Sequence, residues 1–252
     1  MLTVGRATPN KTVIIIPIWN EEERGSFDYI ESVLNLRELD FIIVNDGSSD
    51  GTEMHLMTLV HNPNFFPINL PENAGKSMAI KAGLDFALRD GKYSIIGYLD
   101  GDGAFPISEV QRCSLLAQEK LLKENFDVFI TSRVALSGRI IERKTSRHII
   151  GRVIRTVIGL KYSNLPYDTQ SGFKLFRNTE LFVETANQSF KTKWFVDVEL
   201  LLRLRTHNPS IGVWEEPLMA WKDVSQSSLK WTSAPRVIIE LARVLGLQKK
   251  KK

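Results

Sequence analysis

Residues 12–20 read TVIIIPIWN, a continuous apolar run made largely of β-branched residues. A run this apolar indicates a strand buried on both faces, which is typical of a parallel sheet covered by helices. Similar runs follow at residues 39–46 (LDFIIVND), 93–100 (YSIIGYLD) and 126–133 (FDVFITSR), with a shorter one at 65–73. Helix-like segments separate them. The alternation predicts an α/β fold with a doubly wound, mostly parallel central sheet and helices on both faces.

The segments between these strands carry helix signals. We expect helices over residues 21–36, from about Asp50 onward, over 74–91 and over 106–124. Asp50 is predicted to be the N-cap of the second of these, with Ser48 or Ser49 as alternatives, because a side-chain oxygen at that position accepts the free backbone N–H groups of the first turn. The fourth has Pro106 early in its first turn, where a missing N–H group does no harm.

Polar side chains follow the predicted strands at the point where each one ends. They are Asn20 and Glu21 after the first strand, Asp46 after the second, Asp100 and Asp102 after the fourth, and Arg133 after the fifth. The carboxyl ends of parallel strands share one edge of a sheet, and ligands bind beyond that edge. The sequence therefore predicts a binding site built from these side chains.

The stretch YLDGDGAFP at 98–106 places Asp100 and Asp102 one glycine apart. Mg²⁺ and similar hard cations take carboxylate oxygens, often one or two from the protein, and complete their shell with substrate phosphates and water. Gly101 and Gly103 allow the backbone to turn sharply. A metal site is favoured by the position after a strand, and the alternative is a solvated turn.

Other nucleotide-binding signatures are missing. No Gly-x-Gly-x-x-Gly follows the first strand, which weighs against a dinucleotide oxidoreductase. The segment NAGKSMA contains Gly-Lys-Ser, but Leu70 stands where a phosphate-binding loop needs its first glycine.

A dense basic stretch follows the fifth strand, comprising Arg133, Arg139, Arg143, Lys144, Arg147, Arg152 and Arg155. Arginine forks match phosphate groups, although a solvated helix face would have the same composition. Nucleic acid is disfavoured as a partner because aromatic residues that would stack on bases are nearly absent between 130 and 160.

Composition sets broad limits. The 252 residues, with 43% hydrophobic and 25% charged, suffice for one large globular domain, and the net charge of +4 does not by itself indicate a partner. Cys113, the single cysteine, excludes an internal disulfide, favours a reducing compartment and is not expected to be a nucleophile. No signal peptide or spanning segment is evident, so a cytoplasmic location is expected.

Seven motifs together resemble one family. They are VIIIPIWNEE, IIVNDGSSDGT, NAGKSMAIKAGL, YLDGDGAFP, ITSR, DTQSGFKLF and WFVDVELL, and they occur in the order found in family-2 glycosyltransferases with the GT-A fold. The resemblance covers roughly residues 10–230. The motifs DTQSGFKLF and WFVDVELL are most similar to the branch that makes dolichyl- or polyprenyl-phosphate sugars, and to dolichyl-phosphate glucosyltransferases in particular.

The resemblance implies an inverting transfer from a nucleotide sugar, with UDP-glucose favoured as the donor. The implied nucleotide-binding residues are Pro17, Asn20, Glu21, Asp46, Lys76 and Asp100. Asp100 and Asp102 are the implied ligands of Mg²⁺ or Mn²⁺ on the diphosphate, where the cation offsets charge developing on the leaving group. Lys76 is expected near the base or ribose.

For the acceptor, the resemblance implies that Arg133 and Arg147 grip a polyprenyl phosphate and that Gln170 lines the same site. A phosphate monoester is mostly dianionic at neutral pH, with a second pKa of about 6, and needs positioning more than a base. Asp168 is the candidate base or a group that orients the acceptor, so Asp168, Asp102 and Arg133 form the expected catalytic set. Asp197 and Glu199 are expected to face the site or to anchor the basic loop.

Two departures from the family pattern matter. Ala104 stands where some relatives have a glutamine metal ligand, as it tends to do in the dolichyl-phosphate glucosyltransferase branch. The N-terminal membrane anchor usual in eukaryotic members is not seen, so membrane contact would come from residues 139–155 or from the C-terminal helix and its lysine tail. That helix carries an apolar stripe of Val237, Ile238, Leu241, Val244 and Leu245, which suits a membrane surface or the domain's own core equally.

We therefore expect one domain over 1–252. Residues 12–133 form its nucleotide-sugar half, 134–230 its acceptor half, and 231–252 an amphipathic helix with a basic tail. The alternatives are transfer to a saccharide hydroxyl in cell-surface polysaccharide synthesis, and a catalytically silent nucleotide-sugar-binding module. Oligomeric state is not indicated.

Overall fold

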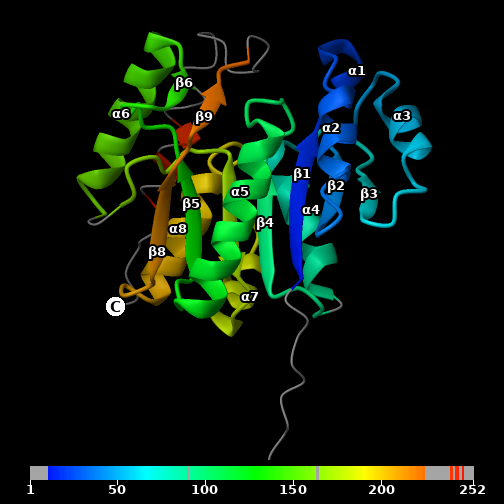
Figure 1. Ribbon diagram of the computed structural model, residues 1–252. Helices are drawn as coiled ribbons and strands as arrows, with labels where there is room; N and C mark the ends of the chain where they lie inside the picture. Colours follow the sequence, from blue (N-terminus) through cyan, green and yellow to red (C-terminus); the bar gives the residue numbers. More distant parts are fainter. Residues whose placement is uncertain are drawn as a thin grey trace, which may run out of the picture.

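The computed structural model describes residues 11–89, 91–162, 165–224, 239–240, 242–243 and 246, without the side chains of 23, 146–148 and 150. Its elements (Figure 1) are β1 (Thr12–Ile18), α1 (Glu21–Arg24), α2 (Phe27–Leu34), β2 (Leu39–Asn45), α3 (Thr52–Thr58), β3 (Phe65–Asn69), α4 (Lys76–Arg89), β4 (Ile95–Leu99), α5 (Ile107–Gln118), a π-helical turn η1 (Glu119–Lys123), β5 (Val128–Ser132), β6 (Ile140–Glu142), α6 (Thr145–Gly159), β7 (Phe173–Arg177), α7 (Glu180–Ala186), α8 (Val196–His207), β8 (Val213–Pro217) and β9 (Ala220–Lys222).

The central sheet has seven strands in the order β3-β2-β1-β4-β7-β5-β8. Every neighbouring pair is parallel except the two that involve β7, which runs antiparallel to both β4 and β5. The expected mostly parallel sheet is confirmed. The reversed direction of β7 has a consequence for the site, because the segment that enters β7 lies at the edge where the parallel strands end.

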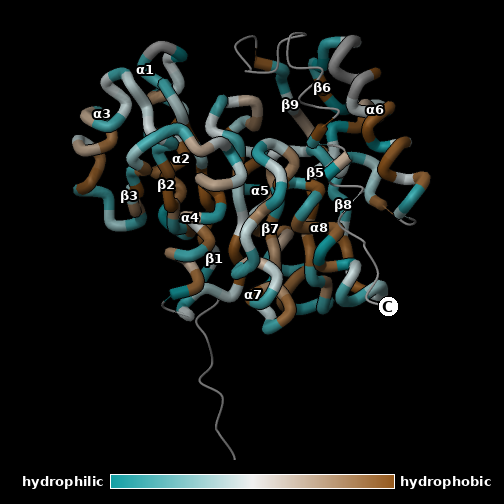
Figure 2. Tube along the Cα trace, turned by 180° about the vertical axis from the view of Figure 1, so that it is seen from behind, coloured by the Kyte–Doolittle hydropathy of each residue, from teal (hydrophilic) through white to brown (hydrophobic). Residues whose placement is uncertain are grey.

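The strands bury both of their faces, as the apolar runs predicted. In β1, Val13 and Ile15 pack into one core cluster, and Ile14 and Ile16 into the other. The first cluster includes side chains of α4, α6, α7 and α8, and the second those of α2, α3 and α5. Figure 2 shows the hydrophobic colouring of the central strands. Helices therefore cover both faces of the sheet.

Three local expectations need correction. The helix expected over 21–36 is divided into α1 and α2, because Gly25 adopts a φ of 69° that ends α1. The N-cap of α3 is Gly51, one residue beyond Asp50, whose carboxylate instead accepts hydrogen bonds from the Thr52 backbone N–H and hydroxyl. Pro106 is the N-cap of α5 and not part of its first turn.

A smaller parallel pair, β6 with β9, lies with α6 beyond the ends of β5 and β8 (Figure 1). None of the described helices has the length and apolar character to cross a membrane. Cys113 is buried in α5, and burial raises the pKa of its thiol to about 12, as suits a packing residue.

The predicted apolar stripe of the C-terminal helix lies outside the described residues. The described Glu240 is buried, and its Oε2 accepts hydrogen bonds from the backbone N–H groups of Lys193 (2.7 Å) and Trp194 (3.2 Å). This part of the C-terminal segment is therefore bound to the domain itself.

Candidate active site

Asp100 and Asp102 lie directly beyond the end of β4. The Asp100 backbone N–H donates to the Gly172 carbonyl at 2.9 Å, and Asp102 Oδ1 accepts from the Ala104 N–H at 3.1 Å. Burial, and then the charge of Asp100, raise the pKa of Asp102 to about 6. Two carboxylates that oppose each other's ionisation form a place where a cation is stabilised.

The donor set of this pair fits a hard divalent cation. Both side chains offer only oxygen, and the described residues contain no group of three or more His, Cys, Asp or Glu side chains that could enclose an ion. A cation here would depend on two carboxylates together with phosphate and water, which is how Mg²⁺ is commonly held. The buried Tyr29 hydroxyl has no hydrogen-bond partner among the described residues, and burial followed by the charges of Asp102 and Asp100 raises its pKa.

Ala104 contributes through its backbone. Its side chain is buried in the core cluster around α5, while its N–H orients Asp102 and its carbonyl accepts from the Lys222 N–H at 3.1 Å. The small side chain at this position therefore packs against the sheet and adds no ligand to the carboxylate pair.

Lys76, the first residue of α4, lies between two carboxylates. Its Nζ is 2.8 Å from Asp100 Oδ1 and 3.2 Å from Asp197 Oδ2. Burial acts to lower the pKa of Lys76, but Asp100 and Asp197 outweigh it and hold the pKa above its usual value. The ammonium therefore stays charged and contacts one member of the expected metal pair, and its expected place near a base or ribose stays a prediction.

Lys174 is a site-region residue that the sequence reading missed. It lies on β7, is fully buried, and donates to the Ser171 carbonyl, with Asp197 Oδ1 3.5 Å away. Burial lowers its pKa. The pKa of Asp197 is lowered because Lys76 and Lys174 outweigh the effect of its burial. A lysine inside the apolar strand FKLF was the available signal, since buried lysines require a partner.

Arg133 and Asp168 form a bidentate ion pair at the end of β5. Arg133 Nε and Nη2 each donate to an Asp168 oxygen at 2.7 Å, and the Arg133 backbone N–H donates to Asp168 Oδ2 at 3.1 Å. Glu215 holds the same turn by accepting the Asp168 N–H at 2.7 Å. Although burial opposes ionisation, Arg133 lowers the pKa of Asp168 to about 2. So low a pKa makes Asp168 a weak general base near neutral pH and favours its orienting role.

The basic stretch reaches this pair through Arg143. Burial, and then the charge of Arg133, lower the pKa of Arg143, so the two guanidinium groups lie within electrostatic range. A Cβ added to Gly151 on α6 would lie 2.9 Å from Arg143 Nη2 and 3.5 Å from Gln170 Oε1, so both side chains converge there. The Arg147 side chain lies outside the described part of the chain. Arg143 is therefore a candidate site residue. The sequence analysis named it only as one member of the basic stretch.

The nucleotide-binding candidates lie beyond β1 and β2. Asp46 is buried, and its two oxygens accept the N–H groups of Ala74 and Gly75 at 2.8 Å each, which fixes the loop before Lys76. The Asn20 backbone N–H donates to Ser48 Oγ, and the Asn20 side-chain amide both donates to Ser49 Oγ and accepts from the Ser49 N–H.

The two remaining nucleotide-binding candidates flank this loop. The Glu21 N–H donates to Thr52 Oγ1 at 2.9 Å. Pro17 lies in β1, with its carbonyl 3.4 Å from the Cβ position of Gly101. These contacts bring the named residues to one edge of the sheet, and their roles toward a nucleotide stay predictions.

Glu199 does not face this cluster. Its carboxylate accepts hydrogen bonds from the backbone N–H groups of Lys191 (2.8 Å) and Thr192 (2.9 Å) and pairs with Arg203. The anchoring alternative therefore describes Glu199, although the loop it holds is 191–192 and not the basic stretch.

The Asp168–Arg133 pair predicts an acid-sensitive contribution to stability. Asp168 has a folded-state pKa of about 2, below the ordinary 3.8, so its contribution is complete above about pH 4 and disappears as pH falls toward 2. We expect the difference in unfolding free energy between the wild type and Asp168→Asn to shrink by about 2 kcal/mol over that window. Denaturant unfolding at a series of pH values measures it, with Asp127→Asn, in the more exposed pair with Arg177, as control. A constant difference down to the lowest pH would contradict the prediction.

Comparison with known proteins places this geometry in context. A family model described as "Glycosyl transferase family 2" matches residues 13–195. A dolichyl-phosphate beta-glucosyltransferase of Trichomonas vaginalis is 29% identical over 244 residues, covering 91% of this chain and 71% of that protein. The dolichyl-phosphate beta-glucosyltransferase of Saccharomyces cerevisiae is 26% identical over 265 residues, covering 95% and 77%.

Among solved structures, glucosyl-3-phosphoglycerate synthase from Mycobacterium tuberculosis is similar in fold. That crystal structure is a complex with Mn²⁺, UDP and phosphoglyceric acid. It superposes with a TM-score of 0.66 at 16% identity and covers 96% of this chain and 80% of that one. The likeness confirms the expected GT-A fold.

Proposed function

The chain belongs to glycosyl transferase family 2, and we propose that it transfers a sugar, with UDP-glucose as the favoured donor, to a polyprenyl phosphate at a membrane surface. It is a glycosyltransferase, so the proposal concerns donor, acceptor and site. The observation that carries it is the Asp168–Arg133 pair. Asp168, the candidate base, is held at a pKa of about 2. A hydroxyl acceptor needs a general base, whereas a phosphate acceptor arrives already ionised.

The donor diphosphate belongs at the Asp100–Asp102 pair. We assign both carboxylates as ligands of Mg²⁺ or Mn²⁺, and Tyr29 as a neighbour whose hydroxyl has no partner among the described residues and can bond the bound group. A cation held there supplies charge that offsets the negative charge developing on the leaving nucleoside diphosphate. The nucleoside then binds at the part of the sheet edge that carries Asn20, Glu21 and Asp46. We retain residues 12–133 as the nucleotide-sugar half and 134–230 as the acceptor half.

The acceptor phosphate belongs at Arg133 and Arg143. Arg133 donates to Asp168 through Nε and Nη2. Its Nη1 is not part of that ion pair. Arg143 places a second guanidinium within range of the same point. Two fixed cations position a phosphate dianion without removing a proton from it. Arg147, on the same helix as Gly151, remains a further candidate, and Gln170 lines the approach.

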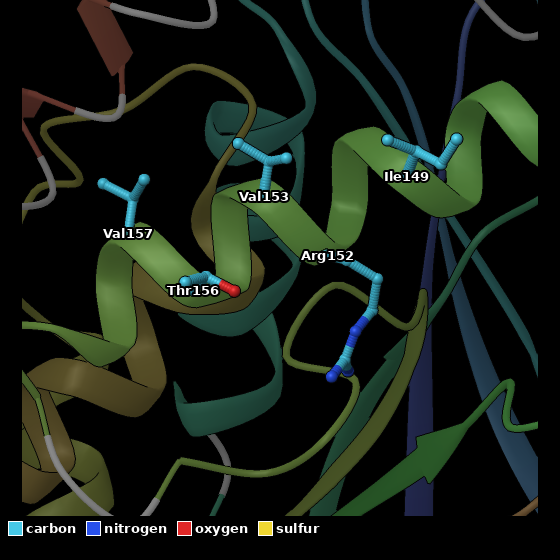
Figure 3. A pocket seen from close by; sticks show the side chains of 5 residues that line it. All are labelled: Ile149, Arg152, Val153, Thr156 and Val157. Atoms are coloured by element: carbon cyan, nitrogen blue, oxygen red, sulfur yellow. The ribbon is translucent and has the colours of Figure 1, made fainter.

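The lipid chain has a candidate surface on α6, the helix whose Gly151 lies against Arg143. On α6, Ile149 and Val153 are more than half exposed, at 56% and 57%. They line an open hollow of about 420 Å³ together with Arg152, Thr156 and Val157. In Figure 3 the three aliphatic side chains extend from one side of α6, whereas Arg152 points away from them. An exposed aliphatic stripe beside cationic residues suits an isoprenoid tail and an anionic membrane surface.

This surface predicts an effect that depends on lipid length. Ile149→Ser together with Val153→Ser should raise KM for a long polyprenyl phosphate about tenfold, because it removes apolar area from the contact. A short, water-soluble polyprenyl phosphate should show little change. Steady-state transfer rates over lipids of increasing length measure it, and Met54→Ser on α3, also exposed, is the matched control. Equal effects on short and long lipids would remove α6 from the acceptor site.

One assay tests the proposed function. Nucleotide sugars are offered one at a time with a short polyprenyl phosphate and Mg²⁺ or Mn²⁺, and the glycolipid product is measured. We expect transfer from UDP-glucose that stops with EDTA. Transfer to a saccharide hydroxyl in place of the lipid would favour the polysaccharide alternative, and nucleotide binding without any transfer would favour a silent binding module.

A further inference from the structure

A chain of alternating charges leads from the proposed metal site into the sheet. Asp100 Oδ1 contacts Lys76 Nζ at 2.8 Å, and the same Nζ lies 3.2 Å from Asp197 Oδ2. Asp197 Oδ1 lies 3.5 Å from Lys174 Nζ, which also donates to the Ser171 carbonyl. We call Asp100, Lys76, Asp197 and Lys174 the charge chain.

The two ends of the charge chain differ in how firmly they are held. Lys174 is fully buried in β7, and Asp197, whose side chain is 9% exposed, lies between two ammonium groups. Asp100 has 36% of its side chain exposed, and Lys76 has 19%. The inner end is therefore fixed by burial and pairing, whereas the contact between Lys76 and Asp100 borders the open site.

Lys76 occupies an oxygen that a metal ion would need. A divalent cation sits about 2 Å from a carboxylate oxygen, and Asp100 Oδ1 already holds the ammonium. The other oxygen, Oδ2, is only 2.0 Å from the point where a Cβ would stand on Gly172, so it fills the space that this glycine leaves. Two cations on one carboxylate repel each other strongly where water is partly excluded.

We propose that Lys76 is the counter-ion that a divalent cation displaces from Asp100. Without metal, the ammonium neutralises Asp100. When the cation arrives, the ammonium leaves Asp100 and remains on Asp197, which Lys174 holds in place. No covalent bond changes, and the exchange swaps one positive partner for another. The inference rests on the proposed metal role of Asp100 and Asp102.

The exchange makes metal binding depend on the donor diphosphate. Displacing Lys76 costs free energy, so the free protein binds the cation weakly, whereas a bound diphosphate adds negative charge for both the cation and the freed ammonium. Coupling of this kind is reciprocal and is commonly 5- to 150-fold in affinity. Lys76 is then a positioning residue that links the two ligands.

The test is a Mn²⁺ titration of the free protein, followed by electron paramagnetic resonance of unbound Mn²⁺, with and without UDP. Lys76→Met should bind Mn²⁺ at least about fivefold more tightly than the wild type without UDP, and should gain less from UDP. Asp197→Asn should bind it more weakly, because Lys76 then has Asp100 as its main partner. Lys81→Met, which removes the exposed pair with Asp85 on the same helix, should match the wild type.

Unchanged or weaker Mn²⁺ binding by Lys76→Met would overturn the exchange. Since buried-charge variants can misfold, a second measurement uses the wild type alone. The side-chain ¹⁵Nζ resonance of Lys76 should shift on adding Mg²⁺ while that of Lys81 does not, and an unmoved Lys76 resonance would also overturn the exchange. Asp102→Asn separates the two failures: if it retains wild-type Mn²⁺ binding, the proposed metal site itself is wrong.

Discussion

Asp102→Asn is expected to lower kcat/KM for sugar transfer at least a thousandfold. That loss corresponds to about 4 kcal/mol of transition-state stabilisation. Asparagine keeps the size of the side chain and an oxygen that can accept the Ala104 N–H, so the turn after β4 should survive. It removes the charge that the proposed cation needs, and the leaving diphosphate then departs without neutralisation. Product formation from UDP-glucose and a short polyprenyl phosphate measures the effect.

Controls separate this loss from damage to the fold. Asp85→Asn alters an exposed carboxylate on α4 and should leave transfer unchanged. Wild-type protein in excess EDTA should fall to the level of Asp102→Asn, because both lack the same cation. Gly172→Ala should also reduce activity, because it displaces the other carboxylate of the pair. The added Cβ would stand 2.0 Å from Asp100 Oδ2. A residual rate within tenfold of wild type in Asp102→Asn would show that Asp102 is not required for the chemistry.

The strand ends and the carboxylate pair could be predicted because their signals are local. Each apolar run marks a strand, and the polar residue after it must lie at the shared edge of a parallel sheet. Asp100, Asp102 and Arg133 followed from that reasoning alone. The break at Gly25 was also a local signal, but one glycine in a helical pattern does not reveal whether its φ will be positive.

The charge chain could not be predicted, because it joins residues that are far apart in sequence. Lys76 and Asp197 are separated by 121 positions, and their partner Lys174 lies on β7, which is inserted between β4 and β5. Hydrophobic periodicity identifies a strand but does not give its order or direction in the sheet. Once β7 is antiparallel, the Asp168–Gly172 segment and Lys174 come to the same edge as Asp100. The contacts that decide how Asp168 behaves are therefore properties of the topology.

Arg133→Lys is expected to lower kcat/KM about a hundredfold, or about 2.7 kcal/mol, mainly through a higher KM for the polyprenyl phosphate. Lysine retains the charge but not the planar fork that engages both Asp168 oxygens at 2.7 Å. Steady-state kinetics with varied acceptor measure the change. Lys120→Arg, in an exposed pair with Glu124, serves as the control.

Asp168→Asn decides what the pair does in catalysis. If Asp168 orients Arg133 for a phosphate acceptor, the variant should lose activity by a similar factor and keep the wild-type pH profile. The double variant should then cost little more than either single change, because both act on one unit. If Asp168 were a general base for a hydroxyl acceptor, Asp168→Asn would be far more damaging than Arg133→Lys, and its residual rate would rise with pH as hydroxide replaced the lost base. A pKa near 2, held there by Arg133 against the effect of burial, favours the first result.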